Sequence, residues 1–298
     1  MTGFDIVVPS CGRPQALPAM LQALHDTSGM PLPDAVLRGE LSITVSDDRF
    51  DPALGAALHA RWPHVRYVAG PARGPASNRN HGAAFGRQPW LLFLDDDCLP
   101  VCDLLAQYRH AIAAQPGIGV FEGAVHAAGP RPDPQHVAPL NTTGGHLWSC
   151  NFAVRRDTFA ALGGFDERFP YALEDCDFAQ RLRAAGHAFV FVPAAVVQHP
   201  WRRTAPHEVW RHVIGHALMA DKHPRFADGW NLLHLARAVR GRLRQYAGPR
   251  WWAIAPQHWA AVACDLVSPL VVTAAVRWPA LRRGLVQRHA NVPQGKLR

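Results

Sequence analysis

Short runs of mainly apolar residues alternate with stretches of helical periodicity along the first hundred residues of the chain. Each apolar run has the length of a buried strand, and the stretches between them repeat apolar residues every three or four positions, as Leu17, Leu21 and Leu24 do. Strands that are apolar on both faces and alternate with helices predict an α/β fold with a mostly parallel sheet covered on both sides. The strands are expected at 5–9, 41–46, 65–68 and 90–94, and further helices at 53–60 and 78–85.

The next part of the chain begins with a long segment rich in Pro and Gly, residues 128–145. A loop of this length inside a compact domain is usually a functional loop or a linker. The α/β pattern then continues to about residue 200, and ligands of such sheets bind beyond the carboxyl ends of the strands. The further elements are a strand at 151–155, a helix at 156–162, a helix from about 174 to 185, and a strand at 189–192 that leads to His199.

Charge is distributed unevenly along the 298 residues. The chain carries 31 Lys and Arg against 23 Asp and Glu, a formal net charge of +8, but residues 229–298 hold 11 of the basic residues and a single acid, Asp265. The same segment holds five of the ten tryptophans. We therefore expect a near-neutral body at 1–228, with halves at about 1–100 and 101–228, and a basic, Trp-rich helical extension at 229–298.

This basic extension suggests contact with an anionic surface. Interleaved Arg and Trp suit the interface of an anionic membrane, and packing on the body with the arginines in solvent is a nearly equal alternative. Single-stranded nucleic acid fits less well, so no nucleic-acid partner is expected. Residues 259–276 approach the length of a membrane span, but Asp265 and Pro269 interrupt the run. A helix lying on the membrane or on the body is therefore favoured there.

The six cysteines and the first residues of the chain bear on the compartment. No two cysteines form a CxxC pair, and the N-terminal residues MTGFDIVVPS lack the basic and apolar regions of a signal peptide. We therefore expect reduced, mostly buried thiols in a cytoplasmic protein, which would be peripheral on the inner face of the cell membrane if the extension binds lipid.

Three consecutive acids, Asp95, Asp96 and Asp97, follow the expected strand at 90–94. Adjacent carboxylates at the exit of a buried strand repel one another, which is costly unless a cation lies among them. Mg²⁺ and Mn²⁺ prefer carboxylate oxygens and commonly bridge them to phosphates. A metal site is favoured over the alternative, an acidic turn that merely closes the strand.

A second acidic group, Glu174, Asp175 and Asp177, opens the helix expected at 174–185. Acids at the first turn of a helix are explained equally well by capping of its free N–H groups and by the positive end of its dipole. The alternative is that one of these carboxylates is a general base, held ionised by the same dipole.

The ordered set of motifs resembles an inverting family-2 glycosyltransferase of the GT-A fold. The resemblance covers about residues 4–200, and the tail from about 229 lies outside it. The segments that carry it are IVVPSCGRP, VSDD, GPASNRNHG, FLDDD, GGFDERFPYALEDCDFAQRLRAAGH and VVQH.

The resemblance implies roles for individual residues. Asp175 would be the general base, and Asp97, Asp95 and His199 would hold a Mn²⁺ or Mg²⁺ ion. Glu174, Trp201, Arg202 and Arg203 are candidates for contacts with the acceptor or with phosphate, and an ordinary solvated surface is as probable for the last three. The residues expected to contact the nucleotide are Pro9, Ser10, Arg13, Asp47, Asp48, Arg79, Asn80, Asp95 and Asp96.

The activity implied is metal-dependent transfer of a sugar from a nucleoside-diphosphate sugar, most often UDP-linked, to an acceptor hydroxyl. The acceptor would be a sugar or a lipid-linked precursor of a cell-surface glycan. Asp175 would remove the proton of the acceptor while Arg79 and the metal neutralise the departing diphosphate, and the attack from the opposite face inverts the anomeric carbon.

Two other functions share part of this pattern. A sugar-phosphate nucleotidyltransferase has similar metal chemistry, but it usually opens with a Gly-rich loop bearing Arg and Lys, which VVPSCGRP does not match. A catalytically inactive, membrane-associated sugar-nucleotide-binding protein is the second. The retention of Asp95, Asp97, Asp175 and His199 argues against it. His212 and His216 share one helical face and could bind a metal, but a polar face near the acceptor is the favoured interpretation.

Overall fold

The computed structural model describes residues 2–169, 171–203, 205–247 and 259–290. The chain forms two compact units, which are described separately. The first contains Met1–Ala128, Pro139–Glu167 and Asp175–Pro200, and the second contains Gly129–Ala138, Arg168–Glu174 and Trp201–Arg298. A boundary near residue 229 between independently folding domains stays a prediction. Arg250 and the Trp251–Trp252 pair lie outside the described residues.

The first unit is built on an eight-stranded sheet in the order β3-β2-β1-β4-β8-β6-β9-β5. Its first four strands pair in parallel and match the apolar runs of the sequence, which confirms the predicted α/β fold. These strands are β1 (Phe4–Ser10), β2 (Leu41–Asp47), β3 (Val65–Ala69) and β4 (Trp90–Leu94). The helices between them are α1 (Ala16–Thr27), α2 (Leu32–Leu37), α3 (Pro52–Arg61) and α4 (Pro75–Ala83).

The second half of this sheet is mixed. Strand β8 (Asn151–Arg155) runs antiparallel to both β4 and β6, whereas β6 and β9 are parallel and the short β5 is antiparallel to β9. The sequence pattern missed β6, because Glu122 and Gly123 interrupt its apolar run. The remaining elements of the unit are β5 (Leu99–Pro100), α5 (Leu104–Ala114), β6 (Val120–Ala127), α6 (Arg156–Ala161), α7 (Glu174–Ala184) and β9 (Val190–His199).

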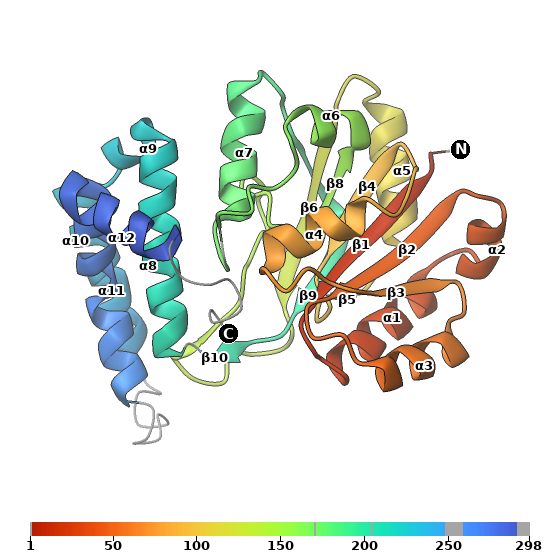
Figure 1. The fold of residues 1–298 in the computed structure, drawn as a ribbon, viewed down its shortest axis with the longest axis horizontal. Coiled ribbons are helices and arrows are strands. Elements are labelled where there is room, and N and C mark those ends of the chain that lie inside the picture. Colours follow the sequence, from red (N-terminus) through yellow and green to blue (C-terminus); the bar gives the residue numbers. More distant parts are fainter. Residues whose placement is uncertain (1, 170, 204, 248–258, 291–298) are drawn as a thin grey trace. The chain divides into compact units, whose positions relative to one another are not determined.

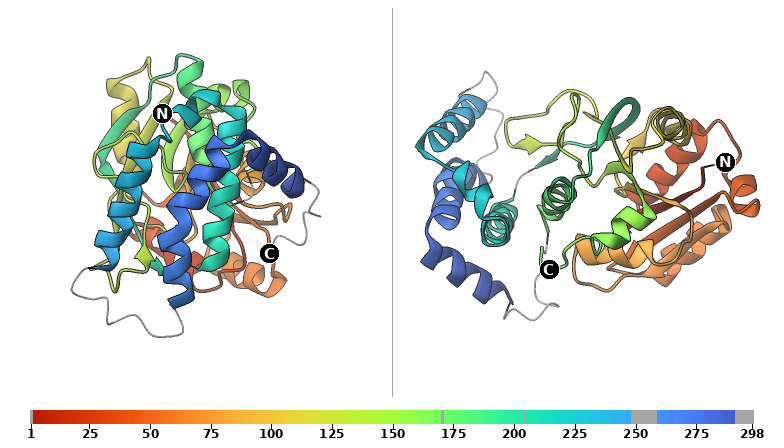
Figure 2. Two further views of the ribbon diagram at one scale, coloured as in Figure 1. Left: turned by 90° about the vertical axis from the view of Figure 1, so that its left-hand side faces the viewer. Right: turned by 90° about the horizontal axis from the view of Figure 1, so that it is seen from above.

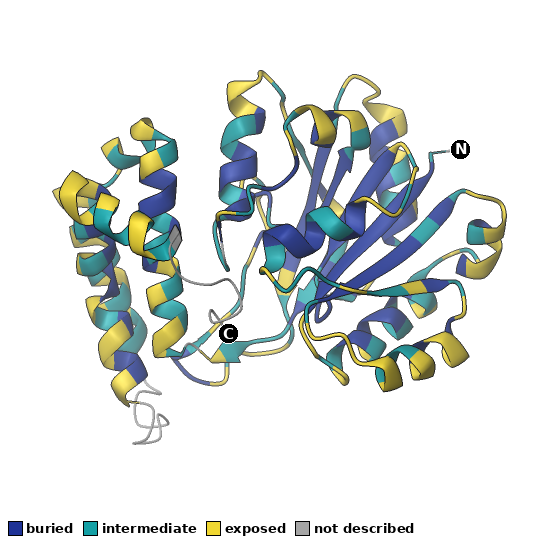
Figure 3. Cartoon of the chain, viewed as in Figure 1, coloured by how far each residue is buried: buried dark blue, intermediate teal, exposed yellow. Residues whose placement is uncertain are grey.

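Helices cover both faces of the sheet, and the core lies in two layers against it. One layer packs α1, α2, α3 and α5 on the sheet, and the other packs α4, α6 and α7. The right-hand view of Figure 2 shows α1 and α5 on one side and α4 and α6 on the other. The central strands β1, β2 and β4 are almost entirely buried, as Figure 3 shows. In the second layer, the aromatic rings of Phe93, Phe152, Phe165 and Phe178 pack together at centroid distances of 5.1–6.2 Å, mostly edge-to-face or tilted.

The second unit contains a two-stranded sheet and the C-terminal helices. The segment 128–145 is not structureless, since it contributes β7, and Asn141 forms a bridge with Val125. Helix α8 packs against α11 through Val213, Ala217 and Val272. The elements are β7 (His136–Val137), β10 (Arg202–Arg203), α8 (Pro206–Lys222), α9 (Pro224–Asp228), α10 (Leu232–Tyr246), α11 (Trp259–Arg277) and α12 (Pro279–Ala290).

All six cysteines lie in the described part of the chain, and none is in a disulfide. Cys98 and Cys150 are buried, Cys102 and Cys176 are half-buried, and the other two are exposed. The expectation that most of these thiols are buried is therefore wrong, because Cys11 lies in an exposed loop and Cys264 on the open face of α11.

The ring of His216 packs inside the second unit, against Phe226 and Trp230. Its Nδ1 lies 2.7 Å from the carbonyl oxygen of His212, the geometry of a structural histidine. Burial lowers the pKa of His216 to about 4. The folded protein therefore binds fewer protons than the unfolded chain between pH 4 and the ordinary pKa of histidine, and stability is lost as the pH falls through that range.

We expect His216→Phe to remove most of this pH dependence. The shift corresponds to roughly 3 kcal/mol of unfolding free energy between pH 7 and pH 4, and a ring of similar size keeps the packing. The measurement is urea unfolding at both pH values, with the exposed His59→Gln as control. If the unfolding free energy depended equally on pH in the two variants, His216 would not be the source of the pH dependence.

Candidate active site

The three acids after β4 are held by two arginines and a serine from other elements of the chain. Arg79, on α4, lies 2.6 Å from Asp95, whereas Arg13, in the loop after β1, bonds Asp96 at 2.9 Å and Asp97 at 2.8 Å. The hydroxyl of Ser10 donates to Asp96 at 2.8 Å. Parallel strands end at the same edge of the sheet, so β1 and β4 bring together residues more than eighty positions apart.

Asp96 is set apart from its two neighbours. Only 3% of it is exposed, and both of its carboxylate oxygens are bonded to the β1 loop. Burial raises the pKa of Asp96 to about 6, and the charge of Arg13 opposes that shift. This carboxyl joins the loops after β1 and β4, and direct contact with a nucleotide stays a prediction for it.

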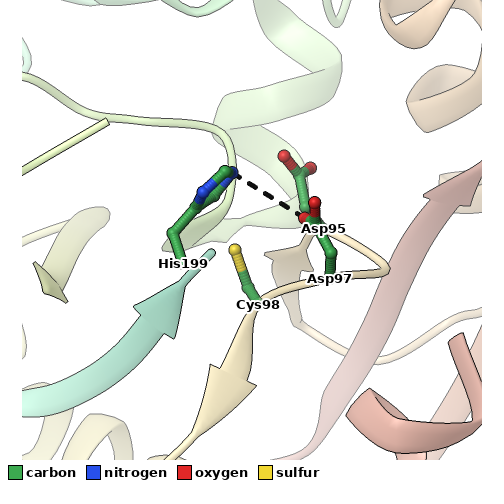
Figure 4. A group of neighbouring side chains, drawn as sticks. All are labelled: Asp95, Asp97, Cys98 and His199. Carbon is green, nitrogen blue, oxygen red and sulfur yellow. Dashed lines mark ion pairs between the residues drawn. The ribbon is translucent and has the colours of Figure 1, made fainter. Parts of the chain in front are cut away.

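Asp95, Asp97 and His199 form a group that can hold a cation. Together with Cys98, each offers one ligand atom, and these atoms all lie within 4.8 Å of one another (Figure 4). The Nε2 of His199 is 3.7 Å from Asp97 Oδ1, and its Nδ1 lies 2.7 Å from the carbonyl oxygen of Pro200. A carbonyl can only accept, so Nδ1 donates to it, and Nε2 is the ring nitrogen that faces Asp97 and would coordinate a metal. Two carboxylates and an oriented imidazole suit Mn²⁺ or Mg²⁺.

Asp175 lies at the start of α7 and on the same side of the sheet as this group. It accepts hydrogen bonds from the backbone N–H groups of Ser149, at 3.2 Å, and Cys176, at 2.8 Å. Burial raises the pKa of Asp175, which opposes the expectation that the helix dipole alone keeps it ionised. Its two backbone hydrogen bonds and the charge of Arg79 lower that pKa, and Asp95 raises it. Arg79 is therefore close to both carboxylates.

The loops after β1 and β2 are fixed by two acids with different partners. Asp47 is fully buried and accepts from the N–H of Gly12 at 2.8 Å and from the hydroxyl of Tyr67 at 2.9 Å. Asp48 accepts from the N–H groups of Ala72, at 2.9 Å, and Gly74, at 3.1 Å. Both acids therefore shape the rim of the site, and reading of a base or ribose by either is untested.

Two further residues expected at the nucleotide hold backbone in place. Pro9 lies within buried β1, in register with Ser46 of β2. The amide of Asn80 donates to the carbonyl of Phe165 at 2.8 Å and accepts from the N–H of Phe165 at 2.9 Å. Asn80 thus ties α4 to the segment that follows α6, and contact with a diphosphate stays a prediction.

The candidates for acceptor or phosphate contacts belong to the second unit. Glu174 is the first residue of α7 and is buried. The indole N–H of Trp201 donates to the carbonyl of Gly129 at 3.0 Å, and Arg203 lies 3.5 Å from Asp133. Arg202 pairs with Val137 between β10 and β7. These contacts place the residues within their own unit and leave their roles untested.

The sequence analysis missed the buried carboxylate of Glu122. It holds the loop at residues 141–147, which leads to Ser149, the residue whose N–H bonds Asp175. Glu122, on β6, is 1% exposed. It accepts from the N–H groups of Gly145, His146 and Leu147 at 2.5, 3.1 and 2.8 Å, and from the amide of Asn141 at 3.0 Å. The only signal in the sequence was an acid inside an apolar run, which marks a buried polar group without naming its partners.

We expect Glu122→Gln to lower the free energy of unfolding by about 2 kcal/mol. Four donors face the carboxylate, so the amide –NH₂ of glutamine must oppose at least one of them. The measurement is urea unfolding, with Glu40→Gln as a matched surface change. Unfolding midpoints that shift equally in the two variants would show that the loop does not depend on Glu122.

The chain resembles curated proteins over part of its length. It is 34% identical over 114 residues to N-acetylglucosaminyl-diphospho-decaprenol L-rhamnosyltransferase of Mycobacterium tuberculosis, covering 37% of this chain and 36% of that protein. It is 25% identical over 194 residues to an uncharacterized glycosyltransferase of Haemophilus influenzae, covering 60% and 61%. The chain thus spans little more than a third of the mycobacterial relative.

Solved structures share the fold at low sequence identity. A mannosyltransferase from Pyrobaculum calidifontis, in complex with GDP-Man and Mn²⁺, superposes with a TM-score of 0.53 at 15% identity, covering 97% of this chain and 75% of that one. S. aureus TarS 1–349 in complex with UDP gives 0.54 at 15% identity, covering 96% and 87%. The sequence model of Glycosyl transferase family 2 matches residues 5–162, more than half of the chain. The chain therefore belongs to glycosyltransferase family 2, as its motifs predicted.

Proposed function

We propose that this protein is a metal-dependent, inverting glycosyltransferase that uses a UDP-linked sugar. The observation that carries the proposal is the position of Arg79, which is bonded to Asp95 of the cation group and is close enough to Asp175 to lower its pKa. The charge of one arginine thus acts on both the cation group and the buried carboxylate. That is the arrangement in which a diphosphate leaves on one side while a hydroxyl attacks from the other.

The leaving group is the first requirement of such a transfer. A nucleoside diphosphate departs readily only if its developing charge is neutralised. A divalent cation supplies that neutralisation when bound, and Asp97 and His199 would hold it. Arg13 pairs with Asp96 and Asp97, and Arg79 pairs with Asp95, so two arginines face three acids at the strand end. The excess acid favours a cation there, and the arginines favour an anionic ligand beside it.

The acceptor proton is the second requirement. Asp175 is 9% exposed, and its raised pKa brings it nearer to neutral pH, where a general base is most effective. The bonds from Ser149 and Cys176 fix its carboxylate, so the proton of the acceptor hydroxyl passes to Asp175 as the oxygen attacks the anomeric carbon. Attack opposite the departing diphosphate inverts that carbon.

The test of the proposed function is a panel of sugar nucleotides with and without Mn²⁺. We expect UDP-sugars to raise the melting temperature only when Mn²⁺ is present, and the slow release of UDP from one of them to depend on the metal. If only a GDP-sugar or a dTDP-sugar stabilised the protein, the proposed UDP-linked donor would be wrong and that sugar nucleotide would replace it. Failure of all donors and of Mn²⁺ to bind would refute the function.

A lipid-linked acceptor would bring the protein to a membrane, and the second unit has a surface suited to one. Helix α11 has a mean hydropathy of 1.8 over a window of which 39% is buried, so by length and composition it could also cross a bilayer. Its single acid, Asp265, is buried and bonded to Tyr246 at 2.9 Å. The exposed side of α11 before Arg277 is therefore uncharged, with Val267 and Leu270 about half exposed.

Helix α10 adds exposed positive charge to this surface. None of its residues is buried, and Arg242 ties it to α11 through Asp265 at 3.3 Å. Exposed arginines and exposed leucines on one helix match the headgroups and acyl chains of an anionic bilayer. We therefore propose that the protein binds an anionic membrane surface through this unit, on the cytoplasmic face if its donor is a cytoplasmic sugar nucleotide. The residues concerned are Arg237, Arg240, Arg244, Leu232, Leu233 and Leu243.

We expect the triple change of Arg237, Arg240 and Arg244 to Gln to weaken binding to phosphatidylglycerol vesicles about a hundredfold, because each cation near such a surface contributes about 1 kcal/mol. Vesicle co-sedimentation measures it. The matched control changes three exposed arginines of the first unit, Arg38, Arg66 and Arg87, to Gln. Equal loss in both variants, or no binding by the unchanged protein, would contradict the membrane surface.

A further inference from the structure

The cation group contains a residue with chemistry that the proposed transfer does not use. Cys98 follows Asp97 directly, and the N–H of Cys98 bonds back to the carbonyl of Asp95 at 3.1 Å. That tight turn directs the thiol back toward the acids, and Figure 4 shows its sulfur beside Asp97 and His199. The sulfur is one of the ligand atoms that lie within 4.8 Å of one another, and Cys98 is fully buried.

A thiol changes which cations the group can hold. Mg²⁺ takes oxygen ligands and gains nothing from sulfur, whereas Zn²⁺, Cd²⁺ and Co²⁺ bind thiolate and imidazole strongly. One sulfur, one imidazole and two carboxylates make up a four-ligand set of the kind that Zn²⁺ accepts, and only small side-chain movements would be needed to close it. The residues suited to Mn²⁺ thus also belong to a ligand set that suits softer cations such as Zn²⁺, Cd²⁺ and Co²⁺.

We propose that Cys98 is a ligand for soft divalent cations, so that Zn²⁺, Cd²⁺ or Co²⁺ binds at the same position as the catalytic Mn²⁺ or Mg²⁺ and excludes it. On binding, a sulfur–metal bond forms, the thiol proton passes to solvent, and no electron is transferred. The inference rests on the proposed function for the position of the cation site. Its consequence is an enzyme that Mn²⁺ activates and thiophilic metals block.

The neighbouring Cys150 provides a matched control. It is buried in the same core layer as Cys98, but it is not among the residues of the cation group. A hydrogen bond with Cys150, together with burial, raises the pKa of the Cys98 thiol well above its ordinary value. Changing either cysteine to Ser therefore perturbs the same small region, and only one of the two changes should remove a metal ligand.

The experiment follows thiolate-to-metal charge-transfer absorption during titration of the full chain with Co²⁺ or Cd²⁺. The exposed thiols are first removed by Cys11→Ser and Cys264→Ser, which gives a background protein. We expect one equivalent of metal to develop the absorption in this background and in its Cys150→Ser form. Cys98→Ser should abolish it and weaken Cd²⁺ binding by about a hundredfold, with Mn²⁺ affinity nearly unchanged.

Either of two results of the titration overturns this proposal alone. The first is a background protein that binds Mn²⁺ without showing the absorption, and this leaves the proposed function intact. The second is an absorption that persists in Cys98→Ser. A protein that binds no divalent cation overturns this proposal and the metal dependence together. If Cys98→Ser does not fold, X-ray absorption of the Zn²⁺-loaded background decides, with one sulfur at about 2.3 Å expected and only nitrogen and oxygen ligands contradicting Cys98.

Discussion

Asp175→Asn is expected to bind sugar nucleotide and Mn²⁺ normally and to transfer sugar about a hundred to ten thousand times more slowly. The loss is that of a general base, since an amide cannot accept the acceptor proton. The change should cost some stability, because the amide –NH₂ must face the N–H of either Ser149 or Cys176, while the amide oxygen keeps the other bond. Turnover with a saturating donor measures the rate, and nucleotide-induced stabilisation measures binding.

The pH dependence of the same variant gives a second, independent readout. A base must be deprotonated to work, so the rate of the wild type should fall as the pH falls through the pKa of Asp175, which burial raises above that of an ordinary aspartate. Asp175→Asn should lose this acidic limb together with its rate. A slow variant that keeps the limb would assign the base to another group.

Asp157→Asn is the matched control for Asp175. Asp157 also lies in the first turn of a helix, α6, but it is exposed and bonds only its neighbour Thr158 among the contacts described. We expect full activity and a small change in stability. If both variants lose activity equally, the effect belongs to helix starts in general and the role proposed for Asp175 fails.

The elements that the sequence predicted correctly are those whose structure follows from neighbouring residues in the chain. The strands β1, β2, β3 and β4 are short apolar runs whose burial on both faces is visible in composition alone. Strand β6 was missed because its carboxylate, Glu122, is stabilised by hydrogen bonds from the segment 141–147, about twenty residues away. A carboxylate inside an apolar run argues against a buried strand until its hydrogen-bond donors are known.

The site divides in the same way. Three adjacent acids at a strand exit repel one another, and this repulsion predicts a cation site from the local sequence alone. The different partners of the three acids cannot be predicted locally, because Arg13 and Ser10 bond Asp96 from 83 and 86 residues away in the sequence. That contact depends on the pairing of β1 with β4, and it occupies both carboxylate oxygens of Asp96. The inward turn that brings Cys98 to the cation group is likewise a property of the folded loop.

The contrast between Asp96 and Asp97 leads to the second large expected effect. Asp97→Asn should weaken Mn²⁺ binding and lower transfer by about a thousandfold, because a Lewis acid contributes several kcal/mol of charge stabilisation at the transition state. Asp97 faces His199 in the cation group, whereas the carboxylate oxygens of Asp96 bond Ser10 and Arg13.

Asp96→Asn is therefore the informative comparison. It removes the same charge one residue away, and it should cost stability while Mn²⁺ affinity stays close to that of the wild type. Mn²⁺ binding measured by electron paramagnetic resonance separates the two variants without any substrate. Equal loss of Mn²⁺ in both would mean that the net charge of the strand end holds the cation. Loss in Asp96→Asn alone would move the ligand to Asp96 and require the loop after β4 to turn over on binding.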